Sequence, residues 1–303
     1  MRLFFSQQYL ASEYQFDTTR KAGWIADSLS FIPIQGVEMA KPGPLTVEEI
    51  ATVHDVPYIE AVRTGEPTHL AQSQGFDWGL GLFPAVSASN GGIVAAALEA
   101  LQTGVSGSLS SGLHHAGKER GRGYCTFNGL VIAARKALEA GAKSVLILDL
   151  DAHCGGGTAS LIEGLPVIRQ VDISVSHFDG YGGMTNSVLE MVDLADEYLP
   201  AIKRHLDEVL VDPPGLVIYN AGMDPFEDCS TGGLAGITFE ILREREQLVF
   251  STFRKEGIPI AFALAGGYVG WKLLQERLVN LHRLTIETAA SFAVMSCRKA
   301  GQS

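Results

Sequence analysis

Cysteine is scarce in this sequence, and the few cysteines are not paired. Four occur among 303 residues, at Cys125, Cys154, Cys229 and Cys297, and no two of them are close in the chain. This spacing indicates neither a disulfide framework nor a Cys-x-x-Cys zinc site. We therefore expect a protein of the reducing cytoplasm.

Long hydrophobic runs and clusters of basic residues are also missing. No segment has the length of a membrane span, and the apolar run within residues 1–8 is too short for a signal peptide. Lysine and arginine number 23 against 34 aspartates and glutamates, which gives a formal net charge of −11. A nucleic-acid groove needs clustered basic residues. We therefore expect a soluble protein that binds neither nucleic acid nor a membrane.

The chain shows no linker, charge block or repeat, so residues 1–303 are predicted to form one domain. Short apolar strands alternate with longer helices, which predicts a three-layer α/β/α fold with a mainly parallel central sheet. A capping box of Thr46 and Glu49 predicts one further helix start. Strands are expected at 3–5, 106–110, 145–148, 166–175, 215–219 and 259–264, and helices at 18–29, 85–102, 127–140, 200–210, 239–256 and 271–295.

The most informative stretch begins with four aliphatic residues, 145–148, which are typical of a strand buried on both faces. It ends in Asp149, Asp151 and His153, and period-2 alternation places these three on one side of an extended chain. One imidazole with one or two carboxylates suits a divalent metal such as zinc. Taken alone, the motif fits equally well with aspartates that cap a turn and a histidine bonded at the sheet edge.

Other predicted strands also end in unusual polar residues. His114 with His115, Asp224, and Tyr268 each follow one of them. Parallel strands share a direction, so their carboxyl ends lie along one edge of the sheet, where ligands of open α/β sheets bind. We therefore expect these side chains to meet the motif at Asp149 in one site.

Five short segments carry this pattern: Leu-His-His-Ala at 113–116, Gly-Tyr-Cys-Thr-Phe-Asn at 123–128, Asp-Leu-Asp-Ala-His at 149–153, Asn-Ala-Gly-Met-Asp at 220–224 and Gly-Gly-Tyr at 266–268. In these segments, and in this order, the chain resembles the histone deacetylase family within the arginase/deacetylase fold. The match looks closest to the class IV branch and to bacterial histone deacetylase-like amidohydrolases. The first hundred residues match only loosely.

The resemblance implies a metal centre in which Asp151, His153 and Asp224 bind one zinc ion. Such a set of three ligands leaves a coordination position for water. The metal would polarise the substrate carbonyl and lower the pKa of that water, which supplies a nucleophile near neutral pH. The implied reaction removes an acyl group, acetyl or longer, from the side-chain amine of lysine in a protein or peptide.

The resemblance also implies the catalytic side chains. His115 matches the general base, His114 matches its partner close to the leaving amine, and Asp149 would hold His114 in one tautomer. Tyr268 would donate its hydroxyl to the developing oxyanion.

Two accessory sites follow from the same resemblance. A potassium ion would be bound partly by backbone carbonyls, with Asp149, Asp151 and Ser174 as its side-chain ligands. A substrate channel would be formed by three further residues, with two tyrosines as walls and a rim carboxylate that grips the substrate backbone. These residues are Tyr124, Tyr181 and Asp77.

The chain departs from many relatives at two positions beside the zinc-binding histidine. Cys154 stands where they have a second histidine, and Gly156 stands where they have Asn or Asp. The glycine removes a side chain that could orient His115. Either another group holds this base, or it is less well poised for catalysis.

Three other functions compete with lysine deacylation. A two-manganese ureohydrolase of the same fold would need carboxylates where this chain has Gly155, Tyr219 and Ala221, so we reject it. A catalytically weak protein that binds acyl-lysine remains open, although His115 and Tyr268 are both present. A deacetylase of polyamines or other small acyl-amines also remains open, but the short connections leave no room for the inserted loop that acetylpolyamine enzymes generally carry. The sequence does not determine the oligomeric state.

Overall fold

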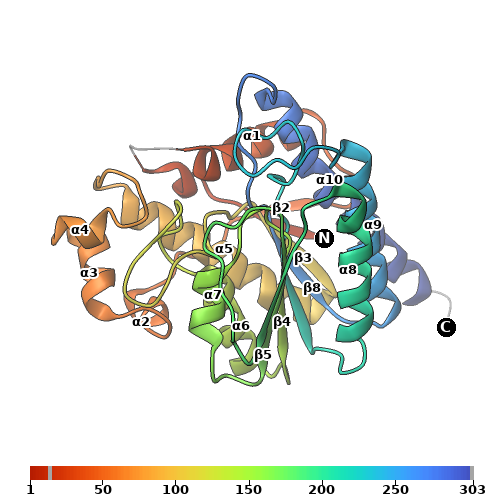
Figure 1. The fold of residues 1–303 in the computed structure, drawn as a ribbon, viewed down its shortest axis with the longest axis horizontal. Helices are drawn as coiled ribbons and strands as arrows, with labels where there is room; N and C mark the ends of the chain where they lie inside the picture. Colours follow the sequence, from red (N-terminus) through yellow and green to blue (C-terminus); the bar gives the residue numbers. More distant parts are fainter. Residues whose placement is uncertain (13–15, 301–303) are drawn as a thin grey trace.

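The structure, a computed structural model, describes residues 1–12 and 16–300. Within these residues eight strands form one sheet, with every neighbouring pair parallel, in the order β2-β1-β3-β8-β7-β4-β5-β6 (Figure 1). The strands are β1 (Arg2–Phe4), β2 (Glu38–Ala40), β3 (Val105–Ser108), β4 (Val145–Asp149), β5 (Ile168–Ser174), β6 (Ser187–Met191), β7 (Leu216–Asn220) and β8 (Ile260–Ala263).

Helices cover both faces of this sheet, as Figure 1 shows. Side chains of α1, α8, α9 and α10 pack on one face, and those of α3, α5, α6 and α7 pack on the other. The predicted three-layer α/β/α fold is therefore confirmed. The helices are the 3₁₀ helix η1 (Gln7–Leu10), α1 (Asp17–Phe31), α2 (Val47–Ile50), α3 (Val56–Thr64), α4 (Thr68–Ala71), α5 (Leu82–Thr103), α6 (Gly129–Glu139), α7 (Gly156–Ile162), α8 (Ala195–Val209), α9 (Phe239–Lys255) and α10 (Gln275–Ala300).

Strand β4 shows why this sheet is stable between two helical layers. Leu146 and Leu148 pack into the core on one face, and Val145 and Ile147 pack into the core on the other. All four side chains are fully buried, as expected for a continuous aliphatic run in a parallel sheet. Burying one such side chain stabilises the fold by roughly 1.5–3 kcal/mol.

Several boundaries differ from the prediction, and some elements were missed. The edge strands β2 and β6 are only partly buried, so they lack the aliphatic run that identifies the central strands. Helix α8 begins at Ala195, with Pro200 inside it rather than at its start. Helix α10 begins at Gln275, which leaves Trp271 exposed in the preceding loop. The capping box at Thr46 and Glu49 is confirmed, and the helix it begins ends after one turn at Ile50.

The chain carries no membrane-spanning signal in its described part. No helix there is both long enough and apolar enough to cross a membrane.

Candidate active site and metal centre

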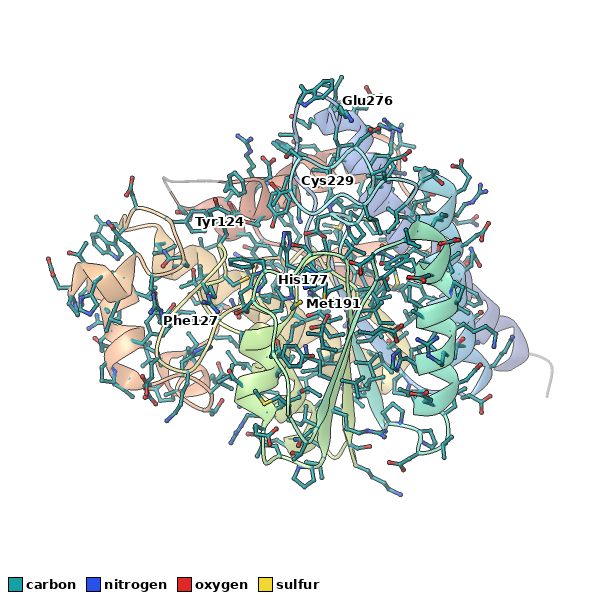
Figure 2. All side chains as sticks on the ribbon, viewed as in Figure 1. Tyr124, Phe127, His177, Met191, Cys229 and Glu276 are labelled. Carbon is teal, nitrogen blue, oxygen red and sulfur yellow. The ribbon has the colours of Figure 1, made fainter. Side chains whose placement is uncertain are left out.

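The predicted site residues meet at the carboxyl edge of the sheet. Strands β3, β8, β7 and β4 are consecutive neighbours, so the segments that follow them run side by side. A small cavity at this edge is lined by His114, His115, Asp151 and Tyr268, which are up to 154 positions apart in the chain. Figure 2 shows Tyr124 and Cys229 near this end of the strands. The common edge that the sequence predicted is therefore present.

Asp151, His153 and Asp224 form a compact set of possible metal ligands. One ligand atom from each lies within 4.8 Å of the other two, and all three residues are buried. His153 Nδ1 lies 3.1 Å from Asp151 Oδ1 and 3.1 Å from Asp224 Oδ2. Two carboxylates and one imidazole nitrogen that converge on one buried point are a suitable donor set for zinc.

The charges of this set also favour a cation. Burial and the neighbouring Asp151 carboxylate raise the pKa of Asp224 to about 6. Burial opposes protonation of His153, but Asp151 and Asp224 outweigh it and raise the pKa of its imidazole to about 10. Two buried carboxylates thus stabilise a positive charge between them, and a bound divalent cation would provide that charge.

His114 is fixed by a buried carboxylate, as predicted. Its Nδ1 lies 2.8 Å from Asp149 Oδ2, while Asn220 donates to Asp149 Oδ1 at 2.8 Å. Burial lowers the pKa of His114, but the charges of Asp149 and Asp151 outweigh it, and the pKa rises to about 10. The imidazole of His114 is therefore protonated on both nitrogens and positively charged at neutral pH. Asn220 was not predicted as a site residue, although it ends β7 in the matched segment.

His115 has the opposite electrostatic environment. Burial and the positive charge on His114 lower the pKa of His115 to about 4, against a hydrogen bond with Asp179 that raises it. The imidazole is therefore neutral at pH 7 and can accept a proton. The partner of Nδ1 is Asp179 Oδ2 at 3.0 Å, a residue that the sequence did not single out.

Tyr268 stands at the far side of this cavity with its ring 6.5 Å from that of His153. It follows a turn in which Gly266 and Gly267 have φ angles of 51° and 87°, a region that favours glycine. Burial and the carboxylates of Asp224 and Asp151 keep the pKa of the phenol well above its usual value. The hydroxyl therefore stays protonated and can donate a hydrogen bond.

Aromatic rings cluster next to the site, and one of them was not predicted. Tyr124 packs against Phe76, with ring centroids 5.3 Å apart. Phe178, which was not predicted, stands edge-on to His115 and His153 at 5.0 and 6.0 Å. The hydroxyl of Tyr181 donates to the carbonyl of Val188 instead, at 3.4 Å.

Tyr181 and Asp77, the other two predicted channel residues, have different environments. Tyr181 lines a cavity of about 410 Å³ whose walls also include His115, Gly156 and Asp179. Phe178 lies beside the two histidines instead, just before the turn at Asp179, whose φ angle is 62°. Asp77 is exposed next to the buried Phe76, which agrees with a rim position.

Two further carboxyl groups, those of Asp149 and Asp172, are buried close to the metal set. Asp149 and Asp172 are register partners on β4 and β5, and both are fully buried. Ser174 donates to Asp172 Oδ1 at 2.6 Å, and Gly155 N donates to Oδ2 at 2.7 Å. Burial and the Asp149 carboxylate raise the pKa of Asp172 to about 8. Asp172 was not predicted, and its oxygens join those of Asp149 and Ser174 as ligands that could bind a monovalent cation.

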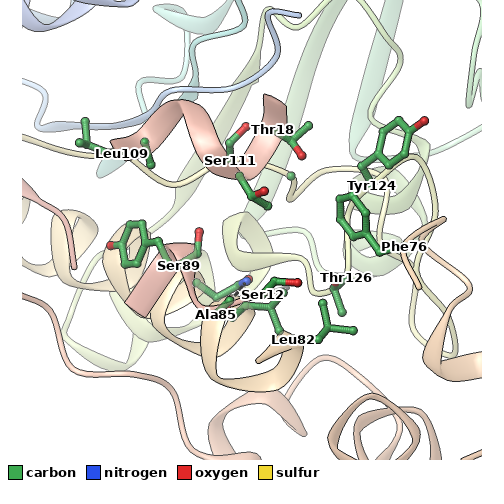
Figure 3. A pocket seen from close by; sticks show the side chains of 16 residues that line it. Ser12, Thr18, Phe76, Leu82, Ala85, Ser89, Leu109, Ser111, Tyr124 and Thr126 are labelled. Carbon is green, nitrogen blue, oxygen red and sulfur yellow. Dashed lines mark hydrogen bonds between the residues drawn. The ribbon is translucent and has the colours of Figure 1, made fainter. Parts of the chain in front are cut away.

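A small cavity lies next to the site (Figure 3). Its volume of about 20 Å³ is enough for one water molecule. The hydroxyls of Thr18, Ser111 and Thr126 are buried on its walls without a hydrogen-bond partner among residues 1–12 and 16–300. Thr18 and Ser111 also line the site itself, so the two spaces adjoin.

Comparison with known proteins agrees with this geometry. The model of the histone deacetylase domain matches residues 18–281. The chain belongs to the histone deacetylase family. This confirms the resemblance inferred from the five motif segments and makes the protein a member of a family of amide hydrolases.

The segments that match known relatives cover different shares of those proteins. An uncharacterized protein of Picosynechococcus sp. is 33% identical over 222 residues, which cover 71% of this chain and 74% of that protein. Histone deacetylase 2 of Arabidopsis thaliana is 30% identical over 207 residues, or 64% of this chain and 52% of the plant protein. The acetoin utilization protein AcuC of Staphylococcus aureus is 30% identical over 132 residues, or 40% of this chain and 34% of AcuC.

Solved structures confirm the arginase/deacetylase fold. The HD domain of HDA15 superposes with a TM-score of 0.80 at 20% identity, covering 96% of this chain and 89% of that domain. An acetylpolyamine aminohydrolase from Burkholderia pseudomallei superposes with a TM-score of 0.76 at 18% identity, covering 96% and 99%.

Proposed function

We propose that this histone deacetylase family member is a zinc-dependent amidohydrolase that removes an acyl group, acetyl or longer, from the side-chain amine of lysine in proteins or peptides. The observation that carries the proposal is the convergence of three groups on one buried point. These are the ligand set Asp151, His153 and Asp224, the histidine pair, and Tyr268.

Asp151, His153 and Asp224 would hold the zinc ion, because their donor atoms converge on one buried point. A zinc ion with three protein ligands keeps a coordination position for water or substrate. When bound, zinc would polarise the substrate carbonyl and lower the pKa of a water molecule. The remaining chemistry belongs to side chains of the chain itself.

The two histidines would divide the proton transfers. His115 is neutral, with Nδ1 bound to Asp179, so its Nε2 would accept a proton from the attacking water. His114 is protonated, with Nδ1 bound to Asp149, so its Nε2 would supply a proton to the leaving amine. Two neighbouring imidazoles with pKa values displaced in opposite directions are suited to act as base and acid.

Tyr268 and the aromatic entrance would handle the substrate. The Tyr268 hydroxyl would donate to the carbonyl oxygen as negative charge develops on it. The ring of Phe178 lies next to His115 and that of Tyr124 packs with Phe76 and Phe16, and both would contact the alkyl chain of an acyl-lysine. Asp77 at the rim would accept hydrogen bonds from the substrate backbone.

A potassium ion forms part of the proposal. Asp149, Ser174 and Asp172 offer buried oxygens. In the part of the chain that the structure describes, Asp172 accepts hydrogen bonds from Gly155 N, Gln170 and Ser174, none of which is cationic. A monovalent cation there would relieve the repulsion between the two register-paired carboxylates, Asp149 and Asp172. The melting temperature of zinc-loaded protein should fall when potassium in a sodium-free buffer is replaced by tetramethylammonium. An unchanged melting temperature would remove this ion from the proposal.

A polyamine substrate is the second candidate. The net charge of −11 favours a cationic substrate, and an acetylpolyamine aminohydrolase is among the proteins of similar fold. The catalytic groups would act on either amide.

Hydrolysis of a substrate panel tests both candidates. Lysine peptides that carry acyl groups from acetyl to myristoyl, and acetylated polyamines, are offered to zinc-loaded and to chelated protein. Metal-dependent release from a peptide supports the first candidate, and release from polyamines alone supports the second. If zinc-loaded protein hydrolyses no member of the panel, the remaining function is a protein that binds acyl-lysine.

We also propose a cytoplasmic location. Cell fractionation tests it, and recovery of the protein in a membrane or secreted fraction would contradict it.

A further inference from the structure

His115 is held by a carboxylate that comes from a distant loop. The Asp179 side chain is 6% exposed, and its Oδ2 lies 3.0 Å from His115 Nδ1. Its other oxygen is paired with the guanidinium of Arg122. No other carboxylate is recorded in a hydrogen bond with His115 in the described part of the chain, whereas His114 has its own partner in Asp149.

The backbone at Asp179 is adapted to this contact. Its φ angle is 62°, in the left-handed region, which only Tyr124 shares among the described residues other than glycine. Side chains other than Asn, Asp and Gly rarely adopt this conformation. The left-handed backbone at Asp179 thus aims a buried carboxylate at the imidazole of His115.

Gly156 makes the contact possible. A Cβ atom at this position would lie 2.3 Å from the carbonyl oxygen of Asp179 and 3.0 Å from its Cγ. No real Cβ approaches so closely, so any side chain at 156 would displace Asp179 from His115. The absence of a side chain at Gly156 and the presence of Asp179 are thus two parts of one arrangement.

The electrostatics agree with a carboxylate in its ionised form. Burial alone would raise the pKa of Asp179, but the hydrogen bond to His115 and the charge of Arg122 outweigh it and lower the pKa. An ionised carboxylate can only accept, so the proton of the hydrogen bond is on His115 Nδ1. This leaves Nε2 as the nitrogen that accepts a proton.

We infer that Asp179 is the positioning residue of the general base: it fixes His115 in the Nδ1–H tautomer, with Arg122 holding the carboxylate and Gly156 providing the space. The effect of Asp179 on catalysis rests on the proposed hydrolytic function. Its effect on the tautomer of His115 does not. Among the described residues, the Asp179 carboxylate contacts His115, Arg122 and the backbone N–H of Gly157 rather than the proposed metal ligands.

Substitution by glycine provides a test that does not depend on misfolding. Asp179→Gly relieves the left-handed backbone, so the variant should fold and retain zinc. We expect kcat to fall by roughly 10- to 100-fold with KM little changed, because an orienting partner acts on the base rather than on binding. Asp179→Asn should recover most of this loss, since asparagine tolerates the same backbone and its carbonyl accepts from Nδ1–H.

The matched control is Asp212→Asn. Asp212 also pairs with an arginine, Arg169, at 3.4 Å, but it lies before β7 at the opposite edge of the sheet. This variant should keep full turnover. A folded, zinc-loaded Asp179→Gly variant with unchanged kcat would overturn the inference, as would an Asn variant no better than the Gly variant.

A second measurement separates this inference from the proposed function. Nitrogen-15 NMR of histidine-labelled, zinc-loaded protein reports which ring nitrogen carries the proton, and His115→Gln assigns the signal. We expect protonated Nδ1 in the wild type and a mixture of tautomers in Asp179→Gly. If the wild type hydrolyses nothing in the panel but shows this change, the proposed function fails and the positioning role stands. If the tautomer is the same in both proteins, the positioning role fails whatever the activity.

Discussion

The ammonium group of Lys21 donates a hydrogen bond to the carbonyl oxygen of Gly266, 245 positions along the chain and two residues before Tyr268. One turn earlier on the same helix, Asp17 accepts a hydrogen bond from Val269 N at 2.7 Å. Helix α1 therefore holds the turn that carries Tyr268 from both sides. Burial lowers the pKa of Lys21 to about 8, and nearby carboxylates limit the change, so the amine is mainly charged at pH 7.

Replacing this lysine should weaken both the fold and the catalysis. Lys21→Met leaves the Gly266 carbonyl without its partner and removes a positive charge from among buried carboxylates. We expect the free energy of unfolding to fall by roughly 2–4 kcal/mol, and kcat to fall as the Tyr268 turn loosens. Denaturant unfolding and steady-state kinetics measure the two effects. Lys272→Met, at an exposed lysine after the same turn, is the control, and equal unfolding free energies for both variants would contradict the assigned role.

Loss of a ligand should reduce metal binding directly. Asp224→Ala removes one of three donor groups. It also removes the acceptor of Ala152 N, which donates to Asp224 Oδ1 at 2.9 Å in the wild type. We expect zinc affinity to fall at least about tenfold, measured as metal content after dialysis against a competing chelator. Asp228→Ala, four positions along and paired with Arg277 on the surface, should retain zinc. Full occupancy in Asp224→Ala would mean that the ligand set is misassigned.

Removal of one hydroxyl should separate turnover from metal binding. Tyr268→Phe keeps the ring between Phe16 and His153 and loses only the donor to the oxyanion. We expect kcat to fall by roughly 100- to 1000-fold, with zinc content and melting temperature nearly unchanged. Tyr58→Phe also removes a buried hydroxyl, which donates to Thr126 O at 2.6 Å, and it should cost stability but not turnover. Near-normal kcat in Tyr268→Phe would remove the role assigned to it.

The parts of the site that the sequence predicted are those encoded by strand ends. Asp149, Asp151 and His153 follow a strand whose aliphatic run is unmistakable, and parallel strands bring Asp224 and Tyr268 to the same edge. That reasoning needs only the direction of the strands and the alternation of side chains between the two faces of a strand. The assignment of residues 1–303 to one domain stays a prediction.

The parts that it missed depend on loop conformation. Asp179 reaches His115 through a left-handed turn, and Asp172 faces Asp149 through strand register. Neither turn shape nor register follows from local residue patterns. Gly156 was the one available signal for Asp179, since a missing side chain beside the base implied that another group takes its place. The half-exposed edge strand β6 was missed because its burial pattern resembles that of a loop.

A buried histidine outside the catalytic site should make stability depend on pH. His54 Nε2 accepts from Asn128 N at 2.9 Å, at the start of α6, and Nδ1 contacts Gly117 O at 2.8 Å. Burial lowers its pKa from 6.5 to about 4, although the contact with the Gly117 carbonyl opposes this change. The folded protein therefore keeps this ring neutral where the unfolded chain protonates it.

The sign of the effect follows from the lowered value. Above pH 6.5 both states are neutral at His54, and its stabilising contribution is complete. As the pH falls from 6.5 towards 4, the unfolded state takes up the proton first, so the free energy of unfolding falls, by up to roughly 3 kcal/mol from this group. His54→Gln should lower stability at pH 7.5 but show a shallower loss between pH 6.5 and 4. Urea unfolding across that range measures the slope, with the exposed His69→Gln as control, and parallel slopes for wild type and His54→Gln would contradict the prediction.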